Sequence, residues 1–163
     1  MAVTDLPSFC AEVFDRVVAM EKLAVPGAQA GSYASYEYPY GNLYWTNRLE
    51  SLLTPEQRGV DEFSFTFPIV MRLHTGYLGQ GFDGALEIQL QTVHAPTVMQ
   101  YFWARRDLVY QAGQARIPFF QDDAFDISCQ SGLSLWNDDP AKQLLGVEFR
   151  LTTKARIQIR RMV

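Results

Sequence analysis

The longest regular pattern in the sequence lies near its C-terminus, where apolar and polar side chains alternate over residues 145–160. A period of two places successive side chains on opposite faces of a β-strand. One face comprises Leu145, Val147, Phe149, Leu151, Thr153, Ala155, Ile157 and Ile159, and the other Glu148, Arg150, Thr152, Lys154, Arg156, Gln158 and Arg160. At about 3.3 Å per residue this strand would span roughly 50 Å, well beyond a typical strand. We therefore expect it to bend sharply, to divide at a kink, or to leave the body of the protein.

A second alternation predicts a half-buried strand at residues 63–74, with the apolar set Phe63, Phe65, Phe67, Ile69, Met71 and Leu73. Pro68 cannot donate a ladder hydrogen bond, so we expect a sheet edge or a β-bulge there. Shorter strands are predicted around 127–129 and 133–136. Strands with one apolar and one polar face are typical of antiparallel sheets that are solvated on one side.

Residues 6–23 have the pattern of an amphipathic helix. Apolar side chains recur at three- and four-residue steps, and charged side chains, Arg16 among them, occupy the opposite side. Asp5 is suited to the N-cap because its carboxylate can accept from otherwise unpaired backbone N–H groups. Val25-Pro26-Gly27 is expected to end the helix.

Two further helical segments are predicted with weaker patterns. Residues 85–94 fit both a strand and a helix, and we interpret them as helical. Pro96 is expected to break that element and to stand in the first turn of the next helix, which extends to about residue 103. Thr54-Pro55-Glu56 predicts a single helical turn.

These elements together predict an α+β fold: a mostly antiparallel twisted sheet, helices packed on one of its faces, and a long C-terminal strand. A chain of 163 residues with 48% hydrophobic content fits one domain, residues 1–163. Its parts are the helix 6–23, a tyrosine-rich segment 28–53 and an α+β core 60–163. No stretch has the roughly 18–20 apolar residues of a membrane helix, and the N-terminus lacks a signal-peptide pattern, so we expect no membrane partner and a cytosolic product.

Charge is distributed unevenly along the chain. Residues 1–140 hold 8 Lys and Arg against 17 Asp and Glu, a net charge of −9, whereas residues 141–163 hold 6 against 1, a net charge of +5. An acidic body disfavours specific nucleic-acid binding, which is typical of strongly basic domains. A local basic surface that meets an acidic partner remains compatible with this distribution.

Motifs for catalysis and metal binding are weak. Gly79-Gln80-Gly81-Phe82-Asp83-Gly84 has G-x-G-x-x-G spacing, but Asp83 would place a negative charge beside a phosphate, so we favour a flexible loop. The two histidines, His74 and His94, have no supporting nucleophile or metal motif and are interpreted as surface or edge residues. Cys10 and Cys129 are interpreted as buried thiols. We predict no catalytic residue, no metal site and no cofactor.

Two groups of side chains are candidates for contacts with partners. Tyr36, Tyr38 and Tyr40 alternate in a short segment without Lys or Arg, which suits a protein interface, the cover of a core or, less well, a sugar site. The basic face of the last strand holds Arg150, Lys154, Arg156 and Arg160. Such a face is typical of a strand that faces solvent or of an edge strand whose charges prevent aggregation. It is also typical of a surface that docks to an acidic neighbour.

The order of elements resembles that of the tail terminator and neck proteins of long-tailed bacteriophages, which are small α+β proteins. The segments that carry the resemblance are Leu6-Pro7-Ser8-Phe9, Tyr38-Pro39-Tyr40-Gly41, Phe67-Pro68-Ile69-Val70-Met71-Arg72, Pro96-Thr97-Val98-Met99-Gln100-Tyr101-Phe102 and Gly146-Val147-Glu148-Phe149-Arg150-Leu151. The resemblance is one of layout over most of the chain. The family has no catalytic residues, so none is transferred.

The resemblance implies a structural virion protein, assembled in the host cytoplasm, that forms a homo-oligomeric ring, commonly a hexamer. Such a ring caps the tail tube and joins it to the head-completion or connector protein, and DNA can pass through it. A ring stops a growing polymer when its two faces differ, because head-to-tail contacts then close instead of propagating. The alternative function is a binding module that recognises a sugar or peptide through the tyrosine-rich face, and a third hypothesis is a small enzyme that uses the glycine-rich loop.

Overall fold

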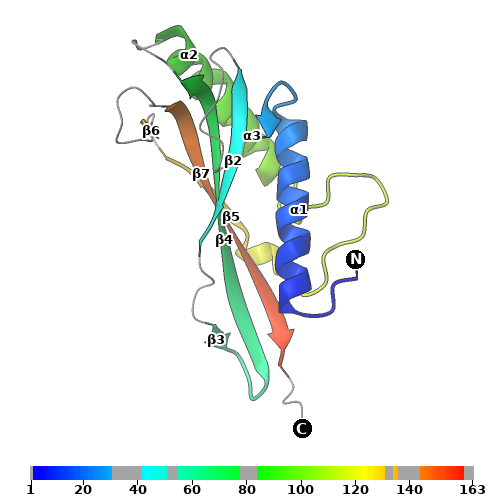
Figure 1. Ribbon diagram of the computed structural model, residues 1–163. Helices are drawn as coiled ribbons and strands as arrows, with labels where there is room; N and C mark the ends of the chain where they lie inside the picture. The colour runs from blue at the N-terminus through cyan, green and yellow to red at the C-terminus, as the bar shows by residue number, and fades with distance from the viewer. Residues whose placement is uncertain are drawn as a thin grey trace.

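The computed structural model describes residues 2–30, 42–50, 55–77, 84–130, 134–135 and 144–159, and it has the expected α+β fold (Figure 1). In chain order the elements are α1 (Leu6–Ala24), β1 (Gln29–Ala30), β2 (Leu43–Leu49), β3 (Glu56–Gln57), β4 (Glu62–Tyr77), α2 (Gly84–Gln89), the π-helical η1 (Leu90–His94), α3 (Ala95–Trp103), the 3-10 turn η2 (Asp122–Ala124), β5 (Asp126–Cys129), β6 (Ser134–Leu135) and β7 (Leu144–Gln158). Within the described residues the strands form one sheet in the order β1-β2-β4-β7-β5, with β3 on β4 and β6 on β7. The sheet is antiparallel apart from the β1–β2 pair, which is parallel.

The centre of the sheet is the antiparallel pair β4 and β7. Its register extends from Glu62 opposite Gln158 to His74 opposite Gly146, and shifts before Tyr77. The predicted alternation is confirmed in both strands, because Met71, Leu73, Val147 and Phe149 are fully buried on the helix side. Figure 1 shows that the end of the pair near β3 extends beyond α1, so part of the long strand leaves the body of the protein.

Helices α1 and α3 cover one face of the sheet and share one hydrophobic core with it (Figure 1). The predicted N-cap is confirmed: the Asp5 carboxylate accepts from the Ser8 backbone N–H at 3.0 Å, and Ser8 Oγ accepts from the Asp5 N–H at 3.1 Å. This reciprocal pair satisfies N–H groups that the first turn leaves unbonded. Lys22 lies in the last turn, where a cation interacts favourably with the helix dipole.

The predicted solvent-side position of Arg16 is wrong. Arg16 is only 7% exposed, and its guanidinium donates to the backbone oxygens of Leu108 at 3.2 Å and Ala115 at 2.8 Å. Its Nε also donates to Glu12 at 2.8 Å. The guanidinium thus satisfies carbonyls of the segment after α3, which covers the polar side of α1 at this point.

Two boundary predictions are also corrected. Pro96 does not break the helix before it, because α2, η1 and α3 are continuous and Pro96 stands in the first turn of α3. The π-helical η1 lies directly before α3, and π-bulges and prolines are both positions at which a helix can bend without ending. The helical turn predicted at Thr54-Pro55-Glu56 is wrong, since Glu56 and Gln57 form β3 and pair with Ser64 and Phe63 of β4. Pairing with the exposed end of β4 overrides the local capping signal.

Pro68 lies within β4 opposite Thr152 of β7 and not at a bulge. Its carbonyl accepts from the N–H of Glu50, the residue that follows the last residue of β2, at 3.4 Å. Because N–H and C=O of one residue point to the same side of a strand, the missing donor of Pro68 faces the end of β2. The prediction of a sheet edge or a bulge at Pro68 is therefore wrong, because β4 is a central strand and Pro68 lies between β7 and the residue after β2.

Gly146 is the residue that allows the β4–β7 register to pass His74. A Cβ at position 146 would lie 2.5 Å from the Leu73 carbonyl oxygen and 2.6 Å from His74 Cβ, closer than real Cβ contacts. Any larger side chain would therefore force the two central strands apart.

Gly146→Ala is expected to lower the free energy of unfolding by about 1–3 kcal/mol, because the added methyl group overpacks the contact between β4 and β7 and the two backbones must move apart. Urea denaturation followed by circular dichroism measures the change. Gly27→Ala serves as the control, since nothing lies within 4 Å of a Cβ built there. Equal stability of the two variants would contradict the assigned register.

Candidate functional site

The predicted contact residues fall into two groups. Tyr36, Tyr38, Tyr40 and Arg160 lie outside the described residues. Arg150, Lys154 and Arg156 all belong to β7 at alternate positions, so they share the face of the sheet opposite the helices. The structure thus places the described part of the predicted basic face together.

Two cations of this face are already paired within the chain. Arg150 donates to Glu50 at 2.5 Å, and Arg156 donates to Glu62 through Nε at 2.6 Å and through a second nitrogen at 3.0 Å. The hydrogen bond from Arg156 lowers the pKa of the Glu62 carboxyl. These exposed pairs contribute little stability in water, but they reduce the positive charge that the face offers to a partner.

The prediction that both histidines are surface or edge residues is wrong for His74. This side chain is 1% exposed, its Nδ1 lies 2.8 Å from the Thr75 carbonyl oxygen, and its ring stacks on Tyr44 at a centroid distance of 5.9 Å. Burial lowers its pKa, which favours the neutral ring. His94 is half-buried, and burial lowers its pKa as well.

The thiols are half-buried rather than buried as predicted. Cys10 and Cys129 are both free and have intermediate exposure, and burial raises the pKa of each thiol. A raised pKa disfavours the thiolate, which is the nucleophilic form. In the described part of the chain no group of three or more His, Cys, Asp or Glu side chains is placed to hold a metal ion.

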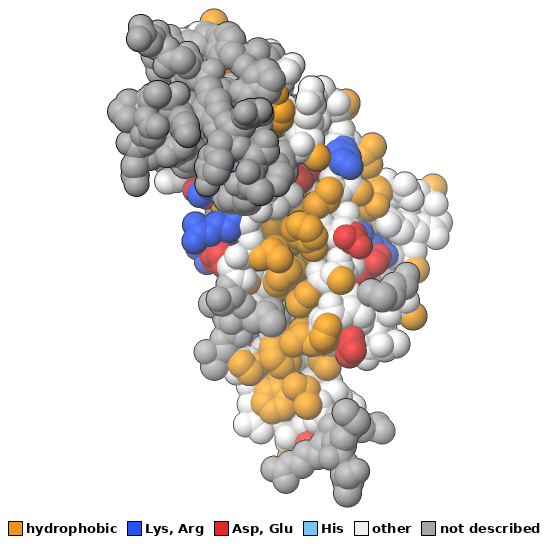
Figure 2. Space-filling view, viewed as in Figure 1, with side chains coloured by type: hydrophobic (Ala, Val, Ile, Leu, Met, Phe, Trp, Pro, Cys, Tyr) orange, Lys and Arg blue, Asp and Glu red, His pale blue; other side chains and the backbone are white. Residues whose placement is uncertain are grey.

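An apolar groove lies between α1 and the end of β2. It has a volume of about 360 Å³, and all the side chains that line it are apolar: Leu6, Pro7, Cys10, Ala11, Phe14, Leu49 and Phe67. Figure 2 shows hydrophobic side chains gathered in a continuous band on this side of the molecule. We call these seven residues the apolar groove.

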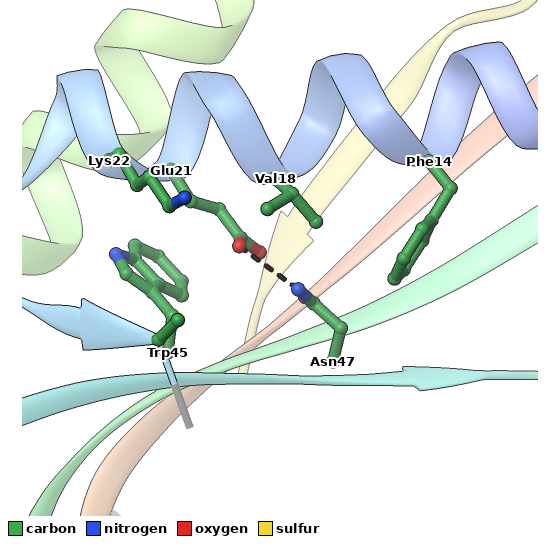
Figure 3. Close-up of a pocket in the computed structure, with 7 residues that line it drawn as sticks. Phe14, Val18, Glu21, Lys22, Trp45 and Asn47 are labelled. Atoms are coloured by element: carbon green, nitrogen blue, oxygen red, sulfur yellow. Dashed lines mark hydrogen bonds between the residues drawn. The ribbon is translucent and has the colours of Figure 1, made fainter. Parts of the chain in front are cut away.

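A second cavity, the Glu21 pocket, continues along α1 and shares Phe14 with the apolar groove. It has a volume of about 210 Å³ and is lined by Phe14, Val18, Glu21, Lys22, Ala30, Trp45 and Asn47. Figure 3 shows Glu21 on α1 and Asn47 on β2 pointing toward one another, with Trp45 on one side and Phe14 on the other. Asn47 Nδ2 donates to Glu21 Oε2 at 3.0 Å.

Glu21 is an unusual residue for a helix face that packs on a sheet. Its side chain is 1% exposed, and burial raises the pKa of its carboxyl to about 8, against the smaller opposing effects of the Asn47 hydrogen bond and the Lys22 charge. Glu21 Oε1, Asn47 Oδ1 and Trp45 Nε1 are buried and make no hydrogen bond to a described residue. Buried polar atoms are normally paired, so these three mark the pocket as a candidate site.

The position of Glu21 in the sequence is a signal for this pocket that no catalytic or metal motif contains. Glu21 follows Val17 by four residues and Phe14 by seven, so it occupies the apolar face of the helix. A carboxyl among core positions is a candidate functional group by its location alone. Trp45 and Asn47 carried no such signal, because their proximity to Glu21 depends on how β2 packs against α1.

Glu21→Gln is expected to change the pH dependence of stability. The folded pKa of about 8 lies above the ordinary value of 4.5, so the wild-type free energy of unfolding falls as pH rises between these values. The glutamine variant lacks this loss, and its stability relative to wild type should grow by on the order of a few kcal/mol up to about pH 8 and then level off.

Urea denaturation at a series of pH values measures this difference. Asp15→Asn is the matched control, because it removes an exposed carboxylate from the same helix. Parallel stability curves for wild type and Glu21→Gln would contradict the assignment of a buried, proton-binding carboxyl.

Comparison with family models and with curated proteins yields no match for this chain. Among the helices that the structure describes, none is long and apolar enough to cross a membrane.

Proposed function

We propose that this protein is a structural subunit of a bacteriophage tail that assembles into a homo-oligomeric ring, caps the tail tube and joins it to the head connector. Its action is binding through surfaces, with no catalytic step. The layout that motivates the proposal is the α+β fold with an N-terminal helix, a central strand and a long C-terminal strand that pairs with it.

The observation that carries the proposal is the apolar groove. All seven of its lining residues are apolar, and Leu49 at its border is 52% exposed. Exposed apolar surface of this kind is typical of protein interaction sites. A second copy of the same chain is the occupant we propose.

The difference between the two faces of the sheet supports a head-to-tail contact between copies. The apolar groove lies on the helix side of the sheet, whereas Arg150, Lys154 and Arg156 lie on the opposite face. The sequence adds an acidic body and a basic C-terminal segment. A subunit with two unlike surfaces forms a heterologous contact, and a heterologous contact that closes generates a ring.

Leu49→Asp is expected to weaken self-association at least about tenfold, because it places a charge at the border of the apolar groove. Light scattering coupled to size-exclusion chromatography measures the mass over a concentration series. Circular dichroism should show an unchanged monomer fold, since the side chain is already half in solvent.

Val60→Asp is the control, because Val60 is 88% exposed and does not line the apolar groove. A wild-type protein that remains at 18.6 kDa at every concentration would overturn the ring proposal. An oligomer that Leu49→Asp and Val60→Asp affect equally would overturn the role of the groove. Negative-stain electron microscopy of the wild-type oligomer is expected to show closed rings.

A further inference from the structure

The Glu21 pocket contains two oxygen atoms that lack a donor. Glu21 Oε1 and Asn47 Oδ1 are both buried, and neither accepts a hydrogen bond from a described residue. The other carboxyl oxygen of Glu21 is already held by Asn47 Nδ2 at 3.0 Å, which fixes the carboxyl between α1 and β2. A ligand group rich in N–H donors would satisfy both free oxygens at once.

The walls around this pair suit a positively charged organic group. Trp45 lies on one side of the Glu21–Asn47 pair and Phe14 on the other, with Val18 between them on α1 (Figure 3). Aromatic rings attract organic cations, most strongly where water is excluded. The volume of about 210 Å³ is far above the roughly 10–15 Å³ that one water needs, so a group with several carbon atoms fits.

The electrostatics of the pocket lead to the same class of ligand. A carboxyl held out of water is costly in its ionised form unless a cation pairs with it. Lys22 is the one other charged side chain among the described residues that line the pocket. It is exposed, and its charge lowers the pKa of Glu21 by less than burial raises it. The residues of β1 and β2 that line it, Ala30, Trp45 and Asn47, carry no charge.

We propose that the Glu21 pocket binds an organic cation, a primary ammonium or a guanidinium group, whose N–H groups donate to Glu21 Oε1 and Asn47 Oδ1. The proposal is independent of the ring function. Binding converts the Glu21 carboxyl to a carboxylate, so one proton leaves the protein for the solvent as the cation enters.

This proton release makes the affinity for the cation depend on pH. Because the pKa of the free Glu21 carboxyl is about 8, affinity for the cation should rise about tenfold per pH unit between pH 6 and 7 and become constant above pH 8. Calorimetry with n-butylammonium in two buffers of different ionisation enthalpy measures both the affinity and the protons released. Tetramethylammonium, which has no N–H group, is expected to bind at least tenfold more weakly.

Variants of the full chain test whether binding of the cation depends on Glu21 itself or only on the net charge of the protein. Glu21→Gln keeps the shape of the protonated side chain and should abolish both binding and proton release, whereas Asp15→Asn should leave both unchanged. Lys22→Gln removes the nearby positive charge and should strengthen binding two- to tenfold. The proton count in wild type remains a test if Glu21→Gln is poorly folded.

Two sources of the cation can be told apart. If n-butylammonium dissociates wild-type oligomers and Glu21→Gln assembles weakly, the natural cation is a Lys or Arg side chain of a neighbouring copy. If assembly is unaffected while n-butylammonium binds, the natural ligand is a small free amine. No binding at tens of millimolar, affinity that falls as pH rises, or equal affinity in Glu21→Gln overturns the proposal.

Discussion

The antiparallel pairing of β4 with β7 forms the centre of the sheet, and the other strands and helices pack around it. The two strands are 16 and 15 residues long and stay in register from Glu62 opposite Gln158 to His74 opposite Gly146. Every other strand of the described sheet adds to one of these two, apart from β1, which joins through β2. One apolar face of the pair receives α1 and α3, and its end projects past α1. Both the apolar groove and the Glu21 pocket lie where α1 meets β2, the strand that pairs with the outer side of β4.

The apolar groove and the Glu21 pocket follow from the way α1 lies on this sheet. Phe9, Val13 and Val17 face the core and are fully buried, whereas Leu6, Cys10 and Phe14 lie toward β2 and are only partly covered. The helix therefore has a wider apolar face than the sheet can bury. One end of the space between α1 and β2 is lined by apolar side chains only, and the other contains the buried Glu21 carboxyl, which Asn47 holds.

Sequence periodicity predicted the long strands, α1 and the fold class, because alternation and three- to four-residue steps are local and are preserved on folding. Sequence-based predictions failed where contact with a residue far away in the chain determines the local structure or the burial of a side chain. Glu56 pairs with β4 instead of forming a helical turn, Arg16 is buried by the segment after α3, and His74 is enclosed between Tyr44 and the β7 backbone at Gly146. The sequence did not predict the Glu21 pocket because Asn47 is 26 positions away from Glu21 in the chain.

We propose that one copy of this protein docks a surface of its own into the apolar groove along α1 of the next copy. A cryo-electron microscopy map of the assembled particle would show this contact. We expect Leu6, Phe14 and Leu49 to be covered by a neighbouring copy that presents a different surface from its own groove. A particle in which these side chains face solvent, or in which two grooves face each other across a two-fold axis, would contradict it.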